Sequence, residues 1–109
     1  MNTLKKKLII RKKNDYIKLL TFSKKIILNY IIINYLKNNF NYPRIGFIIK
    51  KKIINKSFLR NYFKRILKEF FRKNKNRFEN FDVLIIFKKS LLINKEYIIK
   101  DINNFLIKK

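Results

Sequence analysis

The side chains best suited to chemistry in this chain belong to residues 60–65, Arg-Asn-Tyr-Phe-Lys-Arg. The surrounding apolar spacing predicts a helix from about Ser57 to Lys73. One face of this helix gathers apolar side chains, from Leu59, Tyr62, Phe63, Ile66 and Phe70. The other face gathers polar and cationic ones, from Arg60, Asn61, Lys64, Arg65, Lys68 and Arg72. Like charges one turn apart destabilise a free helix, and a bound phosphate backbone removes that repulsion.

A second group of cations precedes this helix. Lys50, Lys51 and Lys52 follow one another at the end of a predicted strand, and Lys56 extends the positive region toward the helix. Backbone N–H groups at the start of a helix add an anion site. A run of lysines alone is weak evidence, but beside the cationic helix it indicates a polyanion surface.

Three tyrosines, Tyr16, Tyr30 and Tyr35, lie on elements that could pack around one face of a sheet. Exposed aromatic rings beside cations stack unpaired bases. Core packing is the more frequent role for any single tyrosine, and the sequence does not choose among the three.

Composition favours a folded domain with a polyanionic partner. The chain has 109 residues, with 29 Lys and Arg against 6 Asp and Glu, for a formal net charge of +23. The 48% hydrophobic content, with 11 Phe and 6 Tyr, is too rich for a disordered chain. We therefore expect a basic surface that binds nucleic acid. A merely soluble basic protein and a protein for anionic membrane surfaces are the alternatives.

Several kinds of chemistry lack their usual residues. The absence of Cys and His removes thiolate and imidazole ligands, the commonest general base and a Ser-His pair. The six acidic residues are scattered, with Glu79 and Asp82 the only close pair, and loop solvation explains that pair better than a site does. We expect no catalytic side chain and no metal site formed by the protein alone.

The elements that position these groups follow from the apolar patterns. Residues 1–13 are predicted to be a mobile basic arm, and Asn14 or Asp15 to cap a short helix. Gly46 is expected to mark the close approach of another backbone. Strands are predicted at 27–36, with room for a shorter one before it, at 44–50, and at 81–87 as one buried on both faces. Residues 37–43 are predicted to form a turn and 74–80 to break the pattern. A helix is predicted from Asn94, with Ile98, Ile102, Phe105 and Leu106 facing inward.

The order of these elements, α-β-β-β-α-β-α, predicts the fold class. It indicates one domain over 1–109, an α+β fold built as a small α/β sandwich with a mixed sheet.

Targeting signals are not expected. The apolar run at residues 8–10 is too short for a signal peptide, and Arg11 interrupts it. The longest apolar stretch, residues 26–36, contains Asn29 and Asn34 and falls below the ~20 residues that cross a bilayer. The sequence therefore predicts a cytoplasmic protein.

Taken together, several short motifs form a family pattern. They are Pro-Arg-Ile-Gly-Phe at 43–47, Lys51-Lys52, Arg60-Asn61, Lys64-Arg65, and Phe-Asp-Val-Leu-Ile-Ile at 81–86 followed by Lys88-Lys89. In order and spacing this pattern resembles the protein subunit of bacterial ribonuclease P. The likeness covers residues 42–109 and extends more loosely to 11–16.

The resemblance implies both a fold and a role. It implies a left-handed βαβ crossover through the long helix. It also implies that an RNA subunit cleaves precursor transfer RNA to form the mature 5′ end, with magnesium held by the RNA subunit and substrate. The protein, as one copy per RNA, would bind that RNA and hold the single-stranded 5′ leader in a cleft between the first helix and the sheet.

Carried over residue by residue, the resemblance assigns three groups. The RNA-subunit face is predicted to be Arg60, Asn61, Lys64, Arg65 and Lys68. Phosphate or substrate contacts are predicted at Arg44, Lys51 and Lys52, and the leader cleft is predicted to be lined by Tyr16 with Tyr30 or Tyr35.

The chain departs from the family pattern at three places. Tyr62 stands where the family motif has arginine, residues 53–55 replace a loop that often carries glycine, and Leu20 stands at a commonly aromatic position. The alternative function is that of a ribosomal or other small RNA-binding protein with no enzymatic role.

Overall fold

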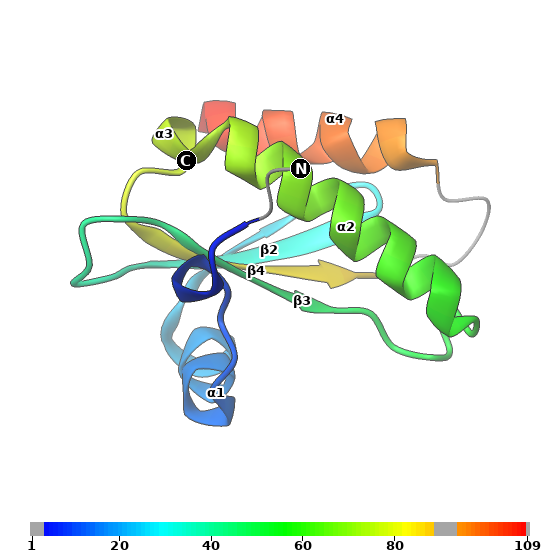
Figure 1. The fold of residues 1–109 in the computed structure, drawn as a ribbon, viewed down its shortest axis with the longest axis horizontal. Coiled ribbons are helices and arrows are strands. Elements are labelled where there is room, and N and C mark those ends of the chain that lie inside the picture. Colours follow the sequence, from blue (N-terminus) through cyan, green and yellow to red (C-terminus); the bar gives the residue numbers. More distant parts are fainter. Residues whose placement is uncertain (1–3, 89–93, 109) are drawn as a thin grey trace.

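The computed structural model describes residues 4–88 and 94–108, in which one mixed sheet carries helices on both faces (Figure 1). The sheet has the strand order β1-β2-β4-β3, in which β2 runs antiparallel to β1 and β4 while β3 runs parallel to β4. The strands are β1 (Lys24–Ile27), β2 (Ile31–Lys37), β3 (Arg44–Ile48) and β4 (Phe81–Phe87). The predicted fold class and element order are confirmed. The shorter strand expected before 27–36 is β1, and the main strand begins at Ile31 instead of Ile27.

The helices divide between the two faces of the sheet. In Figure 1, α2 and α4 lie across one face, and α1 projects from the other. The helices are η1 (Lys6–Leu8, a 3-10 turn), α1 (Lys13–Phe22), α2 (Ser57–Lys73), α3 (Lys75–Phe78) and α4 (Lys95–Lys108). The short η1 and α3 were not predicted. Asn14 and Asp15 lie inside the first turn of α1 and give it no side-chain cap, so the predicted capping is wrong.

Strand alternation sorts the side chains between these two faces. Ile31 and Ile33 of β2 point into the main core with α2 and α4. Asn34 and Leu36 of the same strand point toward α1, where Asn34 Nδ2 donates to the Leu19 carbonyl at 3.2 Å. The phase of each strand therefore decides which of its residues can reach α1.

The N-terminal segment differs from the predicted mobile arm. Within its described part, Leu8 and Ile10 are buried. Ile9 forms a parallel bridge with Ile45, and the Ile10 N–H donates to the Ile45 carbonyl at 2.8 Å. The segment therefore packs along the free edge of β3, because its apolar triplet matches that edge and the strand there has unpaired backbone groups.

The buried face of α2 is also rotated from the prediction. Its fully buried residues are Phe63, Leu67 and Phe71. Tyr62, predicted on the apolar face, is 37% exposed at its border. The helix has the predicted bounds, but the cationic stripe lies along its flank instead of opposite the core.

None of the described helices has the length and apolar character that a membrane span requires.

Candidate nucleic-acid interface

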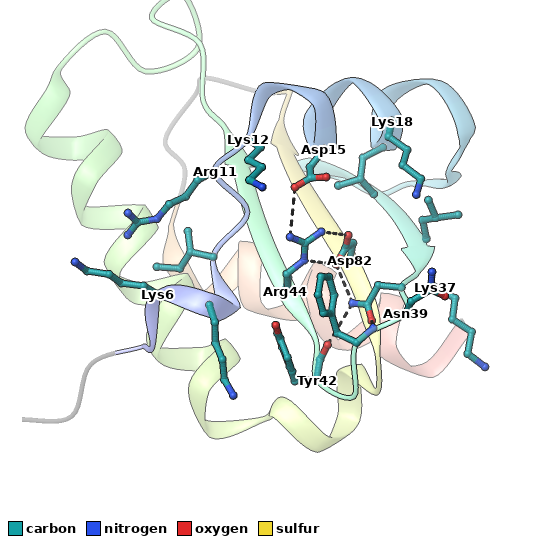
Figure 2. A pocket seen from close by; sticks show the side chains of 16 residues that line it. Lys6, Arg11, Lys12, Asp15, Lys18, Lys37, Asn39, Tyr42, Arg44 and Asp82 are labelled. Atoms are coloured by element: carbon teal, nitrogen blue, oxygen red, sulfur yellow. Dashed lines mark hydrogen bonds and ion pairs between the residues drawn. The ribbon is translucent and has the colours of Figure 1, made fainter.

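A basic cleft opens between α1, the N-terminal segment and the connection from β2 to β3 (Figure 2). Its volume is about 500 Å³. Exposed cations line it, namely Lys6, Lys7, Arg11, Lys12, Lys18 and Lys37. They come from three elements separated in sequence, which is why single motifs did not reveal the cleft.

An ion-pair network forms the floor of the cleft. Arg44 at the start of β3 binds Asp82 through two hydrogen bonds, Nε to Oδ1 at 2.8 Å and Nη2 to Oδ2 at 2.5 Å. Its Nη1 also lies 3.3 Å from the Asp15 carboxylate on α1 (Figure 2). Asn38 Nδ2 completes the network by donating to Asp82 Oδ1 at 2.8 Å. The network ties α1, β3 and β4 together at one corner of the sheet.

This network changes the role open to Arg44. Hydrogen bonding to Asp82 raises the pKa of Arg44 above its usual value, although burial opposes the shift, so the guanidinium stays charged. Its charge is balanced by two carboxylates, and its side chain is only 14% exposed. Arg44 is therefore placed to orient α1 over the sheet, and the exposed lysines remain as the cations open to a phosphate.

An aromatic stack lies at the mouth of the cleft, and the sequence analysis missed it. The rings of Phe40 and Tyr42 stack with centroids 5.1 Å apart. Lys7 Nζ lies 4.7 Å from the Tyr42 centroid, and Arg44 Cζ lies 4.7 Å from the Phe40 centroid. Aromatic faces between cations provide the chemistry that binds single-stranded nucleic acid. The only signal in the sequence was two aromatic residues in a polar turn.

The predicted tyrosine cleft is not assembled as expected. Tyr16 belongs to α1, and its side chain packs against Gly46 of the sheet, where its hydroxyl donates to the Ile10 carbonyl at 3.0 Å. Tyr30 stacks on Tyr97 with centroids 5.0 Å apart, and Tyr35 packs edge-on against Phe105. Both of these belong to the core face that α2 and α4 cover. Placing Tyr30 and Tyr35 with Tyr16 is therefore wrong. Strand phase directs Tyr35 to the opposite side of the sheet, and Tyr30, in the turn before β2, packs on α4 at that side.

The predicted RNA-binding residues of α2 fall into three environments. Asn61 and Arg65 are exposed, whereas Lys64 and Lys68 are half-buried along the flank of the helix. Arg60 is half-buried too, and its Nη1 donates to the carbonyls of the preceding loop, Ile54 at 2.9 Å and Asn55 at 3.0 Å. Farther along α2, Arg72 pairs with Glu69 in the same helix.

The predicted phosphate contacts separate along β3. Lys51 and Lys52 lie exposed in the turn that follows its C-terminal end, beside the start of α2. Arg44 begins the same strand at the opposite end. The structure therefore brings the two lysines next to the α2 residues and places Arg44 in the cleft, so the three do not form one contact group.

Gly46 allows the close packing beneath α1. A Cβ atom built on Gly46 would lie 2.9 Å from the Tyr16 hydroxyl, closer than real contacts allow. The close approach predicted for this glycine is present, but the neighbour is a side chain of α1 and not another backbone. The pair fixes how near α1 comes to the sheet.

Known proteins are similar to this chain in sequence and in fold. The family model described as Ribonuclease P matches residues 4–109. The ribonuclease P protein component of Fusobacterium nucleatum is 37% identical over 97 residues, which cover 88% of this chain and 81% of the relative. That of Syntrophus aciditrophicus is 39% identical over 87 residues, 79% of this chain and 72% of the relative. The structure of the RNase P protein from Thermotoga maritima in complex with 1-(4-fluorophenyl)-2-thiourea matches with a TM-score of 0.81 and 26% identity, over 92% of this chain and 98% of that one. The chain therefore belongs to the ribonuclease P protein family.

Proposed function

We propose that this chain is the protein component of a ribonuclease P and assists removal of the 5′ leader from precursor tRNA. Its partners would be the catalytic RNA subunit and the precursor tRNA, in a ribonucleoprotein with one copy of each subunit. The observation that carries the proposal is the basic cleft, whose two carboxylates, Asp15 and Asp82, are both paired with Arg44. Because precursor tRNA is made in the bacterial cytoplasm, we also propose that the chain acts there.

The cleft would hold the single-stranded leader. Six exposed cations around it attract a phosphate backbone, and the release of counterions drives that binding. Phe40 and Tyr42 offer an aromatic face at its mouth for an unpaired base. The cleft suits a strand without a complement, since unpaired bases are free to stack on these rings whereas the bases of a duplex already stack on one another.

The N-terminal half of α2 would bind the RNA subunit. Asn61 and Arg65 are exposed there, and Lys51 and Lys52 add charge from the adjoining turn. Arg60 would act indirectly by holding that turn against the helix through its bonds to Ile54 and Asn55. Lys64 and Lys68 would meet phosphates along the flank.

Magnesium would be held by the two RNAs. Among the described residues no cluster of three acidic side chains could hold a metal ion, and Asp15 and Asp82 are committed to Arg44. The protein residues described therefore do not fit a magnesium site of their own. The contribution proposed for the protein is electrostatic, because its cations offset the repulsion between RNA subunit and substrate.

Cleavage of precursor tRNA by the cognate RNA subunit tests the proposal. The full chain should stimulate cleavage, and most strongly at low magnesium, where repulsion between the RNAs is least screened. A ribosomal or other RNA-binding protein would bind RNA without stimulating cleavage, and that result would overturn the proposal.

Charge reversal tests the cleft itself. The triple variant Lys12→Glu, Lys18→Glu, Lys37→Glu should weaken binding of precursor tRNA and lower its log–log salt slope by about two to three. Binding of mature tRNA, which lacks the leader, should change little. The matched control is Lys95→Glu with Lys100→Glu, because these exposed residues belong to α4 on the other face of the sheet. Equal losses with both sets of variants would argue against the cleft.

A further inference from the structure

The first turns of α2 carry an aromatic surface that is only partly covered by the core, since Tyr62 packs edge-on against the buried Phe63 with centroids 5.4 Å apart. Phe58 is 64% exposed and Tyr62 is 37% exposed, and their spacing of four residues places them on the same side of the helix. With Leu59, Asn61 and Arg65 they line a shallow hollow of about 430 Å³. Figure 1 shows this end of α2 reaching past the end of β4, where the sheet offers it no surface to cover.

Cations surround this hollow. Arg65 forms part of its wall, and Lys56 Nζ lies 5.8 Å from the centroid of the Phe58 ring. No described acidic side chain lines it. Glu69, one turn beyond Arg65, is engaged by Arg72 and Lys73. The surface therefore suits a partner that combines a flat apolar face with negative charge.

A nucleotide has that combination, whereas a protein helix does not fit. A helix in a groove needs apolar anchors over about two turns. Here the exposed apolar surface ends at Tyr62, because Ile66 and Phe70, the next residues along the same row, are half-buried, and Arg65 and Glu69 lie beside them. Aromatic rings flanked by cations bind unpaired bases by stacking, with the phosphate nearby.

We propose that Phe58 and Tyr62 form a stacking platform for one unpaired base of the catalytic RNA subunit. Arg65 meets the adjoining phosphate, and the exposed amide of Asn61 lies within the same hollow to bind the edge of the base. The inference rests on the proposed function, since it names how the RNA subunit meets this helix. It also gives a role to Tyr62, which stands where the family motif has arginine. An arginine–phosphate contact, which weakens with salt, is replaced by base stacking, which does not.

The salt dependence of RNA binding separates stacking from charge. Binding of the full chain to the catalytic RNA is measured at several salt concentrations. Tyr62→Ala and Phe58→Ala should each weaken binding about 5- to 100-fold at every concentration, with an unchanged log–log salt slope. Arg65→Ala is the matched control and should lower the slope by about one. Tyr62→Phe should bind like the unaltered chain, and Tyr62→Arg should steepen the slope by about one.

Several results would overturn the platform. One is an unchanged affinity of both alanine variants while the unaltered chain binds RNA and stimulates cleavage, which leaves the proposed function standing. A second is a loss of affinity accompanied by a lower melting temperature, since that would make the rings structural. A third is loss of self-association at unchanged RNA affinity, which would assign the surface to a second copy. An unaltered chain that neither binds the RNA nor stimulates cleavage would overturn the proposed function together with the platform.

Discussion

At the scale of single residues, the cations of the cleft are not equivalent. Lys12, Lys18 and Lys37 are exposed and form no ion pair within the described residues, whereas Arg44 is held by Asp82 and Asp15. Because two carboxylates neutralise the Arg44 guanidinium, it helps to fix the position of α1 more than it attracts a phosphate. Substitutions at the two acids should reveal that difference.

Asp82→Asn should destabilise the fold much more than Asp15→Asn. Asp82 makes two short hydrogen bonds with Arg44 and is nearly buried, so its loss leaves a poorly solvated cation and should cost about 2–4 kcal/mol. Asp15 makes a single longer contact and is more exposed, so its loss should cost less than about 1 kcal/mol. Urea denaturation of the two variants gives both values. Similar losses of stability in the two variants would show that the Arg44–Asp82 pair is not stronger than the Arg44–Asp15 pair.

Gly46→Ala should destabilise the fold by about 1 kcal/mol. The added methyl group would crowd Tyr16, at a cost of about 1–3 kcal/mol, while the lower entropy of the unfolded chain returns about 0.4–1 kcal/mol. Tyr16→Ala removes the crowded ring, so in that background Gly46→Ala should be neutral or stabilising. A double-mutant cycle by thermal unfolding measures this coupling. Independent effects of the two changes would contradict the close packing.

At the scale of elements, α2 carries one arginine held by the protein itself and one open to a binding partner, in adjacent turns. Arg60 closes the loop that precedes the helix, while Arg65 is free at the surface. The two arginines cannot be told apart from the sequence. They differ because Arg60 faces the preceding loop, whereas Arg65 faces solvent.

Arg60→Ala and Arg65→Ala should therefore differ in two measurements. Arg60→Ala should lower stability by about 1–2 kcal/mol, because two charge-assisted hydrogen bonds to the loop are lost. Arg65→Ala should leave stability within about 0.5 kcal/mol and lower the salt slope of RNA binding by about one. Calorimetry and RNA titration of each variant, and of the double variant, provide the comparison. An equal effect of both changes on stability would remove the proposed division.

Elements with strong local patterns were the ones that the sequence predicted best. The bounds of α2 and β4 agree with the prediction because each carries a long apolar period of one kind. The side on which Tyr35 lies could not be predicted in the same way. It depends on which face of β2 meets α1, and pairing with β4, about fifty residues later, fixes that register. Tyr30 lies in the turn before β2, and its side is set by stacking on Tyr97 of α4.

Long-range partners also explain the other misses. Leu8 and Ile10 were too few to form a pattern, and they become part of the core only because β3 offers a free edge. The bond between Arg44 and Asp82 joins residues 38 positions apart in sequence. The sequence thus predicted a basic surface correctly, while the location of the cleft could not be predicted without the assembled sheet.

At the scale of the whole molecule, the charge is large for its size. A formal net charge of +23 is confined to a body of 36 × 35 × 28 Å. At about 0.01 M salt the screening length is about 30 Å, so nearly all cations repel one another across the molecule. Such repulsion opposes the compact state.

Stability should consequently rise with salt. Between about 0.01 M and 0.3 M sodium chloride the melting temperature should increase, by about 4–8 °C for each kcal/mol of repulsion relieved. The variant Lys95→Glu with Lys100→Glu lowers the net charge and should show a weaker salt dependence. Thermal scans monitored by circular dichroism measure both chains. A melting temperature that falls with added salt would mean that specific ion pairs outweigh the general repulsion.

The central place of β4 has a consequence for synthesis on the ribosome. β2 and β3 do not pair with each other, and both wait for residues 81–87 to come between them. A nascent chain that ends before this strand can form the hairpin of β1 and β2 but not the sheet, and the N-terminal segment lacks a stable β3 edge to join. Because the pairing is non-local, folding starts late and proceeds slowly. During translation, a strongly basic and still unfolded chain is therefore exposed to the ribosome's own RNA until residues 81–87 have emerged and the sheet can form.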